Sequence, residues 1–258
     1  PFHPEIVRQL VDNVVEVFRY KMHLEVTVKN QTERLKKQNA MLKLMSEKQK
    51  HMSEDLIDSL SNIVEFRNLE SEQHIKRIRE LTRCLGTSMM KLYPEYELTE
   101  EKLEIIGRAA SLHDIGKIVI PDNIILKSGK LTQDEYEVIK SHTTKGAEII
   151  ERLIHMDSEE FCDYAYDIAR HHHEKYDGNG YPDGLKGDEI SIAAQVVSLV
   201  DVYDALTSKR VYKAAYKTEK AYQMIINGQS GTFSSKLLKA FTEVRTEFED
   251  IVEKYRDD

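Results

Sequence analysis

The chain has 258 residues, of which 40% are apolar and 32% charged, with a formal net charge of -8 and a pI near 5.8. This length fits one large domain with an appendage, or two small domains. The acidic balance argues against nucleic-acid polymers or a membrane surface as partners, since both favour a basic face. No apolar run approaches the roughly 20 residues of a membrane span. Without a visible signal peptide, and with Cys84 and Cys162 expected to be reduced thiols, we expect a cytoplasmic protein.

A long helix is predicted from Pro4 to Gly86, because no glycine or proline interrupts this stretch. Within it, positions alternately four and three apart from Leu24 to Phe66 are mostly apolar, as in a coiled-coil seam. Three glutamines and a serine interrupt the seam and could fix its register. One amphipathic helix lying on its own domain would give a similar pattern. We expect a parallel homodimer instead, because the seam is longer than one globular domain would cover, and we assign residues 1–60 to this coiled coil and 61–258 to a second domain.

The rest of the chain is predicted to be all-α, because no segment alternates with a period of two for more than a few residues. Thr132, with Glu135 three residues later, is typical of a capping box. Loops are expected after Gly116 and from Asp177 to Asp188. Helices are expected over residues 99–112, 131–153 with a break at Gly146, 161–173 and 190–207, with two more after Thr218 and Ser234.

Two short motifs place histidine beside carboxylate. His113 and Asp114, in SLHDIGK, end an apolar helix, where each can bind a metal ion and the carboxylate can bridge two. Buried ionisable groups need partners, which favours metal ligands over a plain polar helix end. Glu70 and His74 would leave the same face of a helix, either as ligands or as an ordinary surface pair.

The stretch HHHEKYDGNGYP, from His171 to Pro182, is too far from either terminus to be a purification tag. His172 and His173 end a patterned helix and point about 100° apart, so they could reach two different ions in one cluster. His171 is expected to be structural or to support the ligands. His142, in KSHTTKG, is expected to end another helix, either as a ligand or as a histidine favoured by the helix dipole.

Charged residues also appear late in the chain, in VVSLVDVYDALTSKRVYK. Asp201 and Asp204 interrupt an apolar helix, where a carboxylate is costly unless it is paired or metal-bound. Arg210 and Lys213 follow on one face, either as a phosphate-binding pair or as a solvated surface.

Together, LHDIGK, HHEKYDGNGYP and DVYDALTSKRVYK resemble the HD-GYP phosphodiesterases of bacteria, a branch of the HD metal-dependent phosphohydrolases. The resemblance runs from roughly Leu60 to the end of the chain, with five motifs in the right order. It implies an HD-type helical bundle that hydrolyses cyclic di-GMP to linear pGpG or to GMP. Two alternatives stay open, a catalytically silent cyclic-dinucleotide receptor and a phosphohydrolase of another nucleotide.

The resemblance also implies the site residues. Lys117 would lie near the scissile phosphate, either holding its oxygens or protonating the leaving ribose oxygen, while Tyr181, Arg210 and Lys213 would contact substrate phosphates. The ligands of two or three iron or manganese ions would be Glu70, His74, His113, Asp114, His142, His172, His173 and Asp201.

Two departures from the family pattern concern Glu72, which stands where glycine is common, and residues 233–235, which are FSS in place of FDP. Gly178 and Gly180 are expected to let the loop turn so that Tyr181 approaches the substrate.

The segment TVKNQTERLKKQNAMLK resembles linkers that follow sensor or receiver domains, and the chain begins with Pro1 rather than Met. We therefore expect an upstream regulatory domain that changes the register or pairing of the long helix, and so alters access to the site.

Overall fold

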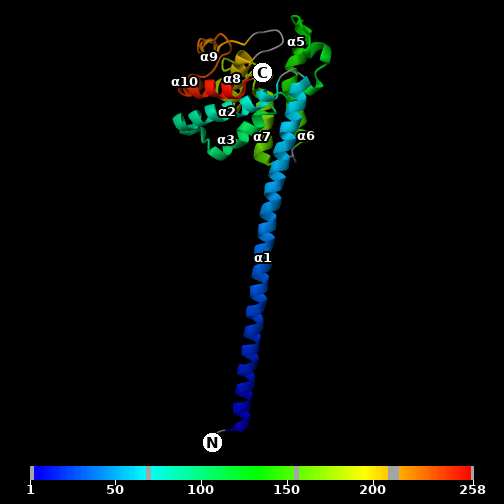
Figure 1. The fold of residues 1–258 in the computed structure, drawn as a ribbon, viewed down its shortest axis with the longest axis vertical. Coiled ribbons are helices and arrows are strands. Elements are labelled where there is room, and N and C mark those ends of the chain that lie inside the picture. Colours follow the sequence, from blue (N-terminus) through cyan, green and yellow to red (C-terminus); the bar gives the residue numbers. More distant parts are fainter. Residues whose placement is uncertain (1–2, 68–70, 154–156, 209–214, 257–258) are drawn as a thin grey trace. The chain divides into compact units, whose positions relative to one another are not determined.

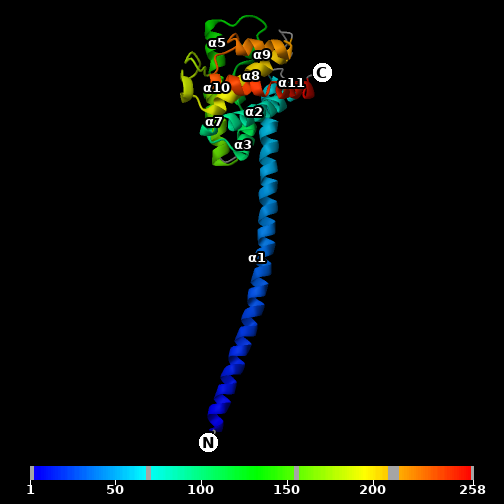
Figure 2. The same ribbon diagram turned by 90° about the vertical axis from the view of Figure 1, so that its left-hand side faces the viewer.

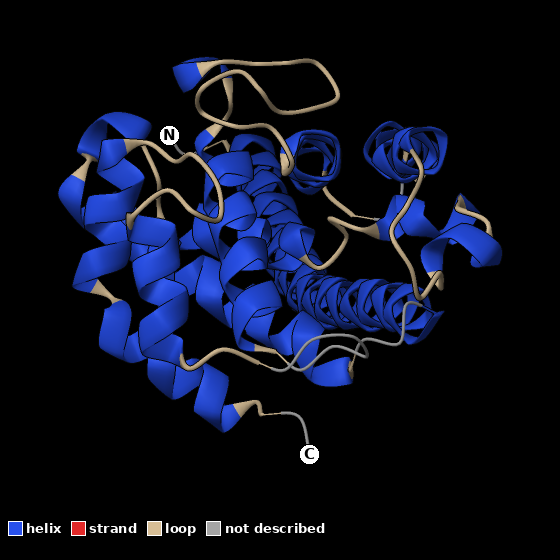
Figure 3. Ribbon diagram, turned by 90° about the horizontal axis from the view of Figure 1, so that it is seen from above, coloured by secondary structure: helices blue, strands red, loops and turns tan. Residues whose placement is uncertain are grey.

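Every regular element in the computed structural model is a helix within the described residues, which are 3–67, 71–153, 157–208 and 215–256 (Figures 1 and 3). The prediction of an all-α fold is therefore confirmed. By its internal contacts the chain divides into two units, Pro1–Met52 and Ser53–Asp258. Among the described helices, none combines the length and the apolar character that crossing a membrane requires.

The first helix, α1 (Pro4–Arg67), ends well before Gly86. A separate helix, α2 (Glu72–Leu92), begins after Ser71, whose backbone is extended (φ −86°, ψ 156°). The prediction of one uninterrupted helix to Gly86 is therefore wrong. Gly86 lies inside α2 instead, where an added Cβ would come within 2.5 Å of Leu103 Cδ2. This glycine permits close packing of α2 against α3 (Glu100–Ala110) and does not end a helix.

The second unit is built around α2, which contacts α3, α8, α10 and α11 (Figure 2). A further helix, α7, packs against α3, α6 and α8. The core between them is formed by apolar side chains such as Ile78, Leu85, Val197 and Phe241. The bounds of the remaining α-helices are α4 (Asp122–Ile125), α5 (Gln133–Lys140), α6 (His142–Arg152), α7 (Glu159–His171), α8 (Ile192–Thr207), α9 (Thr218–Ile226), α10 (Ser235–Glu243) and α11 (Arg245–Lys254).

Local capping signals explain several helix starts. The capping box of Thr132 and Glu135 opens α5, as predicted. The side chain of Ser234, in the FSS segment, accepts a hydrogen bond from the backbone N–H of Leu237 and so begins α10.

Three boundaries differ from the prediction. The expected break at Gly146 is wrong, because α5 ends before Ser141 and α6 runs through Gly146. The expected loop after Gly116 contains two short helices, η2 (Ile115–Val119) and α4. Three helices, rather than two, end the chain, since α11 follows α10 after a single residue, Val244.

The last turns of α1, from Ser53, belong to the second unit and present two different faces. One face is buried and carries Ser53, Ile57, Ser61, Val64 and Glu65. The predicted seam lies on another face, where Leu56, Ile63 and Phe66 are 54%, 59% and 83% exposed. Within the second unit, these three seam residues are therefore not used to pack α1 against the bundle.

Polar contacts hold this part of α1 against the bundle. The buried side chain of Arg108, on α3, donates a hydrogen bond to Asp157, which also accepts a 2.8 Å bond from the hydroxyl of Ser53. Burial alone would raise the pKa of Asp157, but the hydrogen bonds from the backbone N–H of Ser158, from Ser53 and from Arg108 outweigh burial and lower it.

The change Asp157→Asn tests this contact. A carboxylate with a lowered pKa stabilises the fold above its unfolded pKa of about 3.9, and this contribution is lost as the pH falls through the folded value. We expect the variant to lose about 2 kcal/mol of unfolding free energy at pH 7. The difference from the wild type should shrink below about pH 4, as measured by urea unfolding. A difference that stays constant down to pH 3 would contradict this assignment.

Candidate metal centre

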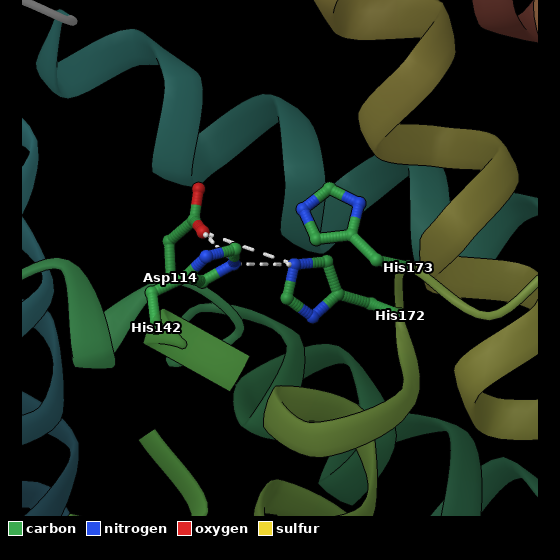
Figure 4. A group of neighbouring side chains, drawn as sticks. All are labelled: Asp114, His142, His172 and His173. Carbon is green, nitrogen blue, oxygen red and sulfur yellow. Dashed lines mark hydrogen bonds and ion pairs between the residues drawn. The ribbon is translucent and has the colours of Figure 1, made fainter. Parts of the chain in front are cut away.

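Three separate segments bring four metal-binding side chains together (Figure 4). Asp114 precedes η2, and His172 and His173 follow the end of α7. His142 begins α6, so the prediction that it ends a helix is wrong. Each offers one ligand atom, and these atoms all lie within 4.8 Å of one another. Imidazole nitrogens with a carboxylate oxygen form a donor set that suits iron, manganese or zinc. The donors thus fit a bound divalent ion.

Gly116 allows two of these segments to meet. A Cβ built on this residue would lie 1.9 Å from the carbonyl oxygen of His142 and 2.5 Å from the amide nitrogen of Gly146. Any larger residue would push η2 away from α6. Glycine is therefore required here for Asp114 to approach His142.

Three histidines each direct their Nε2 atom toward Asp114. The Nδ1–H groups of His113, His142 and His172 donate hydrogen bonds of 2.9, 2.6 and 2.9 Å to backbone carbonyls three or four residues earlier, those of Ala110, Ile139 and Ile168. In a neutral ring, a proton on Nδ1 leaves the lone pair on Nε2. The helical backbone thereby fixes the ring orientation that metal binding through Nε2 needs.

Asp114 lies at the centre of these nitrogens. Its Oδ1 atom is 3.2 Å from His142 Nε2 and 3.8 Å from His172 Nε2. Its Oδ2 atom is 3.2 Å from His113 Nε2 and 2.5 Å from Lys117 Nζ. Both oxygens of one carboxylate thus face nitrogen donors on opposite sides, as a carboxylate that bridges two ions would.

The pKa values follow from burial and from Asp114. Burial keeps His172 neutral and lowers its pKa to about 3, and it also lowers the pKa values of His142 and His173. Burial acts in the same direction on His113, but attraction to the Asp114 carboxylate outweighs it and raises the pKa of His113 to about 9. Burial would raise the pKa of Asp114, yet Lys117 and His113 hold it well below its usual range. The charged carboxylate and three neutral imidazoles are the forms that bind cations.

Two further predicted ligands lie on the His113 side. Asp201 Oδ1, on α8, is 3.8 Å from His113 Nε2. The ring of His74, on α2, has its centroid 5.6 Å from that of His113. The structure therefore places His74, His113 and Asp201 next to the group of four.

Sequence reasoning missed two partners of His74. Its Nδ1 atom is 2.7 Å from Asp204 Oδ2, and Asp204 also accepts a hydrogen bond from Arg77. Asp204 was predicted to be either paired or metal-bound, and it is paired here. The second partner is Glu65 on α1, a buried carboxylate whose Oε1 atom is 4.0 Å from His74 Nε2. The sequence signal that could have revealed Glu65 was the position of a carboxylate between the apolar residues Val64 and Phe66.

The loop after α7 is held in place by Glu174, also missed. Its buried carboxylate accepts hydrogen bonds of 2.7 and 3.0 Å from the backbone N–H groups of Asp183 and Gly184. The Tyr181 ring lies 4.8 Å from that of His173, so it borders the group of four. Gly178 has a positive φ of 82°, as a turn at this position requires.

The remaining residues singled out in the sequence either lie away from the group of four or lie outside the described residues. His171 contacts Asp167 and Asp183, at 2.7 and 3.0 Å, and does not belong to the group of four. Glu70, Arg210, Lys213 and the side chain of Glu72 lie outside the described residues.

A helical bundle that joins a His-Asp pair to further histidines at the ends of helices is the arrangement expected of an HD-type domain. The chain belongs to the HD domain family, since a family model described as HD domain matches residues 58–236. This match and the relatives described next confirm the HD-GYP assignment that the motifs indicated.

Similar proteins include named phosphodiesterases. A cyclic di-GMP phosphodiesterase of Vibrio cholerae is 40% identical over 206 residues, which make up 78% of this chain and 41% of that protein. The cyclic di-GMP phosphodiesterase response regulator RpfG of Xanthomonas campestris is 32% identical over 251 residues, 97% of this chain and 62% of the relative. This chain thus spans about half the length of these relatives.

A solved structure shows the same fold. The crystal structure of a cyclic GMP-AMP specific phosphodiesterase from V. cholerae (V-cGAP3) aligns with a TM-score of 0.55 and 20% identity, covering 80% of this chain and 51% of that chain.

The neighbouring histidines provide a matched test of the centre. We expect His172→Ala to weaken manganese or iron binding by more than the roughly 10- to 100-fold that loss of a supporting group costs. His171→Ala should keep the wild-type metal content, because its imidazole contacts Asp167 and Asp183 instead. Metal content after anaerobic loading and desalting measures both. Equal retention of metal by the two variants would refute this arrangement.

Proposed function

We propose that the chain is a metal-dependent phosphodiesterase that hydrolyses cyclic di-GMP in bacterial second-messenger signalling. The observation that carries the proposal is Asp114, whose two oxygens face the Nε2 atoms of three histidines and the amino group of Lys117. The relatives that are named cyclic di-GMP phosphodiesterases support the substrate.

The proposed ions are iron or manganese, two or three in number. Support comes from the nitrogen and oxygen donors and from their two-sided arrangement around Asp114. When bound, such ions would polarise the phosphate and make a water molecule more acidic. The proposed ligands are Glu70, His74, His113, Asp114, His142, His172, His173 and Asp201.

The side chains beside the donors would orient the substrate. Lys117 Nζ lies 2.5 Å from Asp114 Oδ2, and its positive charge is proposed to hold a non-bridging oxygen of the phosphate. The same amino group could instead protonate the leaving ribose oxygen, which would release linear pGpG and, after a second cleavage, GMP.

Tyr181 is proposed to contact the substrate phosphate from the loop. Burial raises the pKa of Tyr181 above its ordinary value, so its hydroxyl stays protonated and can donate a hydrogen bond to a phosphate oxygen. Arg210 and Lys213 are proposed as further phosphate contacts.

A turnover assay with a lysine control tests the function. Anaerobically loaded protein should convert cyclic di-GMP to pGpG or GMP, and Lys117→Ala should lower kcat about 100-fold without loss of metal. Lys145→Ala is the control, because the side chain of this exposed lysine pairs with Glu148 on the same helix. Products are separated by chromatography.

The same assay separates the two alternatives. Intact cyclic di-GMP bound to fully metal-loaded protein would indicate a silent receptor. Cleavage of another nucleotide in preference to cyclic di-GMP, such as cyclic GMP-AMP, would indicate a different phosphohydrolase. Either result would contradict the proposal that the chain hydrolyses cyclic di-GMP.

We also propose that residues 1–60 pair with a second copy as a coiled coil, under control of an upstream sensor or receiver domain. Seam residues such as Leu35, Leu42 and Met45 are exposed in the single chain. The relative RpfG, which is named a response regulator, aligns with 97% of this chain and so with nearly all of α1.

The change Leu42→Glu should weaken this dimer about 100-fold, because a leucine is lost from each of the two helices and each contributes about 1.5 kcal/mol or more. Lys43→Glu, one position further along, alters charge outside the seam and should leave the dimer intact. Sedimentation equilibrium gives both dissociation constants. A wild-type protein that stays monomeric at high concentration would rule out the pairing.

A further inference from the structure

The last residue of α1, Arg67, makes an unusually complete set of contacts. Its guanidinium group forms five hydrogen bonds, all with the segment from Lys117 to Asp122. A guanidinium has five N–H donors in a rigid planar fork, so the whole donor capacity of Arg67 is directed at this segment.

The contacts alternate between backbone and side chain. Nη1 donates to the carbonyl oxygens of Lys117 and Ile118, at 3.1 and 2.5 Å, and Nη2 donates to that of Ile120, at 2.5 Å. Nε and Nη2 both donate to Asp122 Oδ1, at 2.8 and 2.6 Å. The carboxylate therefore orients the fork, while the fork holds three backbone carbonyls between Lys117 and Ile120.

Apolar packing holds this segment unevenly. Its apolar side chains Ile118 and Val119 are 42% and 52% exposed, whereas Ile120 is buried. Packing therefore fixes the far end of η2 and leaves the middle to polar contacts. Arg67 supplies three of these polar contacts, to the carbonyl oxygens of Lys117, Ile118 and Ile120.

The held segment begins with the lysine of the proposed reaction. The backbone N–H of Lys117 donates a 2.9 Å hydrogen bond to the carbonyl oxygen of Asp114, and its amino group lies 2.5 Å from Asp114 Oδ2. Arg67 binds the third polar group of the same residue, its carbonyl oxygen. A shift of this backbone would move the amino group relative to the carboxylate.

We propose that Arg67 is a positioning residue that fixes Lys117 beside Asp114 and so couples the end of α1 to the reaction centre. The inference rests on the proposed function for the role of Lys117. Because all five donors belong to one side chain at the last position of α1, a rotation or shift of its final turn would disturb all five hydrogen bonds together. The long helix would thereby control the orientation of the lysine, and not the affinity for metal.

Three variants separate this role from general support of the fold. Arg67→Ala removes the fork, and Arg67→Lys keeps the charge but offers three N–H donors on a single nitrogen in place of the planar five-donor fork. Arg83→Ala removes an arginine of α2 that pairs with Glu104 across the α2–α3 contact, away from the segment, and serves as control.

We expect Arg67→Ala to lower kcat about 10- to 100-fold, with little change in KM and with the wild-type metal content. Arg67→Lys should restore little of the rate. Hydrogen exchange of the amides from Lys117 to Ile120 should become faster in both Arg67 variants and stay unchanged in Arg83→Ala. Added guanidinium ion, below concentrations that unfold the wild type, should restore part of the rate of Arg67→Ala only.

Two outcomes would overturn the inference. One is an Arg67→Ala protein with wild-type kcat and wild-type exchange in this segment. The other is a loss of rate accompanied by an equal loss of metal and no rescue by guanidinium, which would show a merely structural role. If the wild type itself cleaves no nucleotide, the proposed function fails, and the exchange measurement still decides whether Arg67 holds the segment.

Discussion

The buried carboxylate of Asp114 is the constraint on which the site depends. A charge in this position is costly unless opposite charges and hydrogen bonds compensate it, and here Lys117 and the histidine nitrogens do so. Those nitrogens face Asp114 because the other nitrogen of each ring is bonded to a helix-end carbonyl. The site therefore lies where helices end or begin, and carbonyl oxygens at these ends accept the Nδ1–H bonds that orient the rings.

Much of the fold and of the donor group could be predicted, because the signals are local. A side-chain oxygen that caps a helix, as at Thr99 and Thr132, acts within three residues of its position. In the adjacent pairs His113–Asp114 and His172–His173, the relative directions of the two side chains are also set by the local backbone, within one turn. The structure brings both pairs and His142 to one place, as the motifs implied.

The rest depends on contacts between distant positions. Gly146 looks like a helix breaker but lies inside α6, where the missing side chain admits η2. Glu65, Arg67 and Asp204 find partners 9, 50 or more, and 130 positions away, so a local pattern can indicate that a buried carboxylate needs a partner but does not identify that partner. Within the second unit, Glu65 and Arg67 join the end of α1 to His74 and to the segment that begins with Lys117.

The central claim is that Asp114 and the histidines around it converge on cations. Anomalous diffraction from crystals grown anaerobically with manganese or iron, recorded at the absorption edge of that metal, tests it most directly. We expect an anomalous peak bounded by Asp114, His142, His172 and His173, with Nε2 of His142 and His172 directed at it. Strong peaks at other places, with none beside Asp114, would contradict the account.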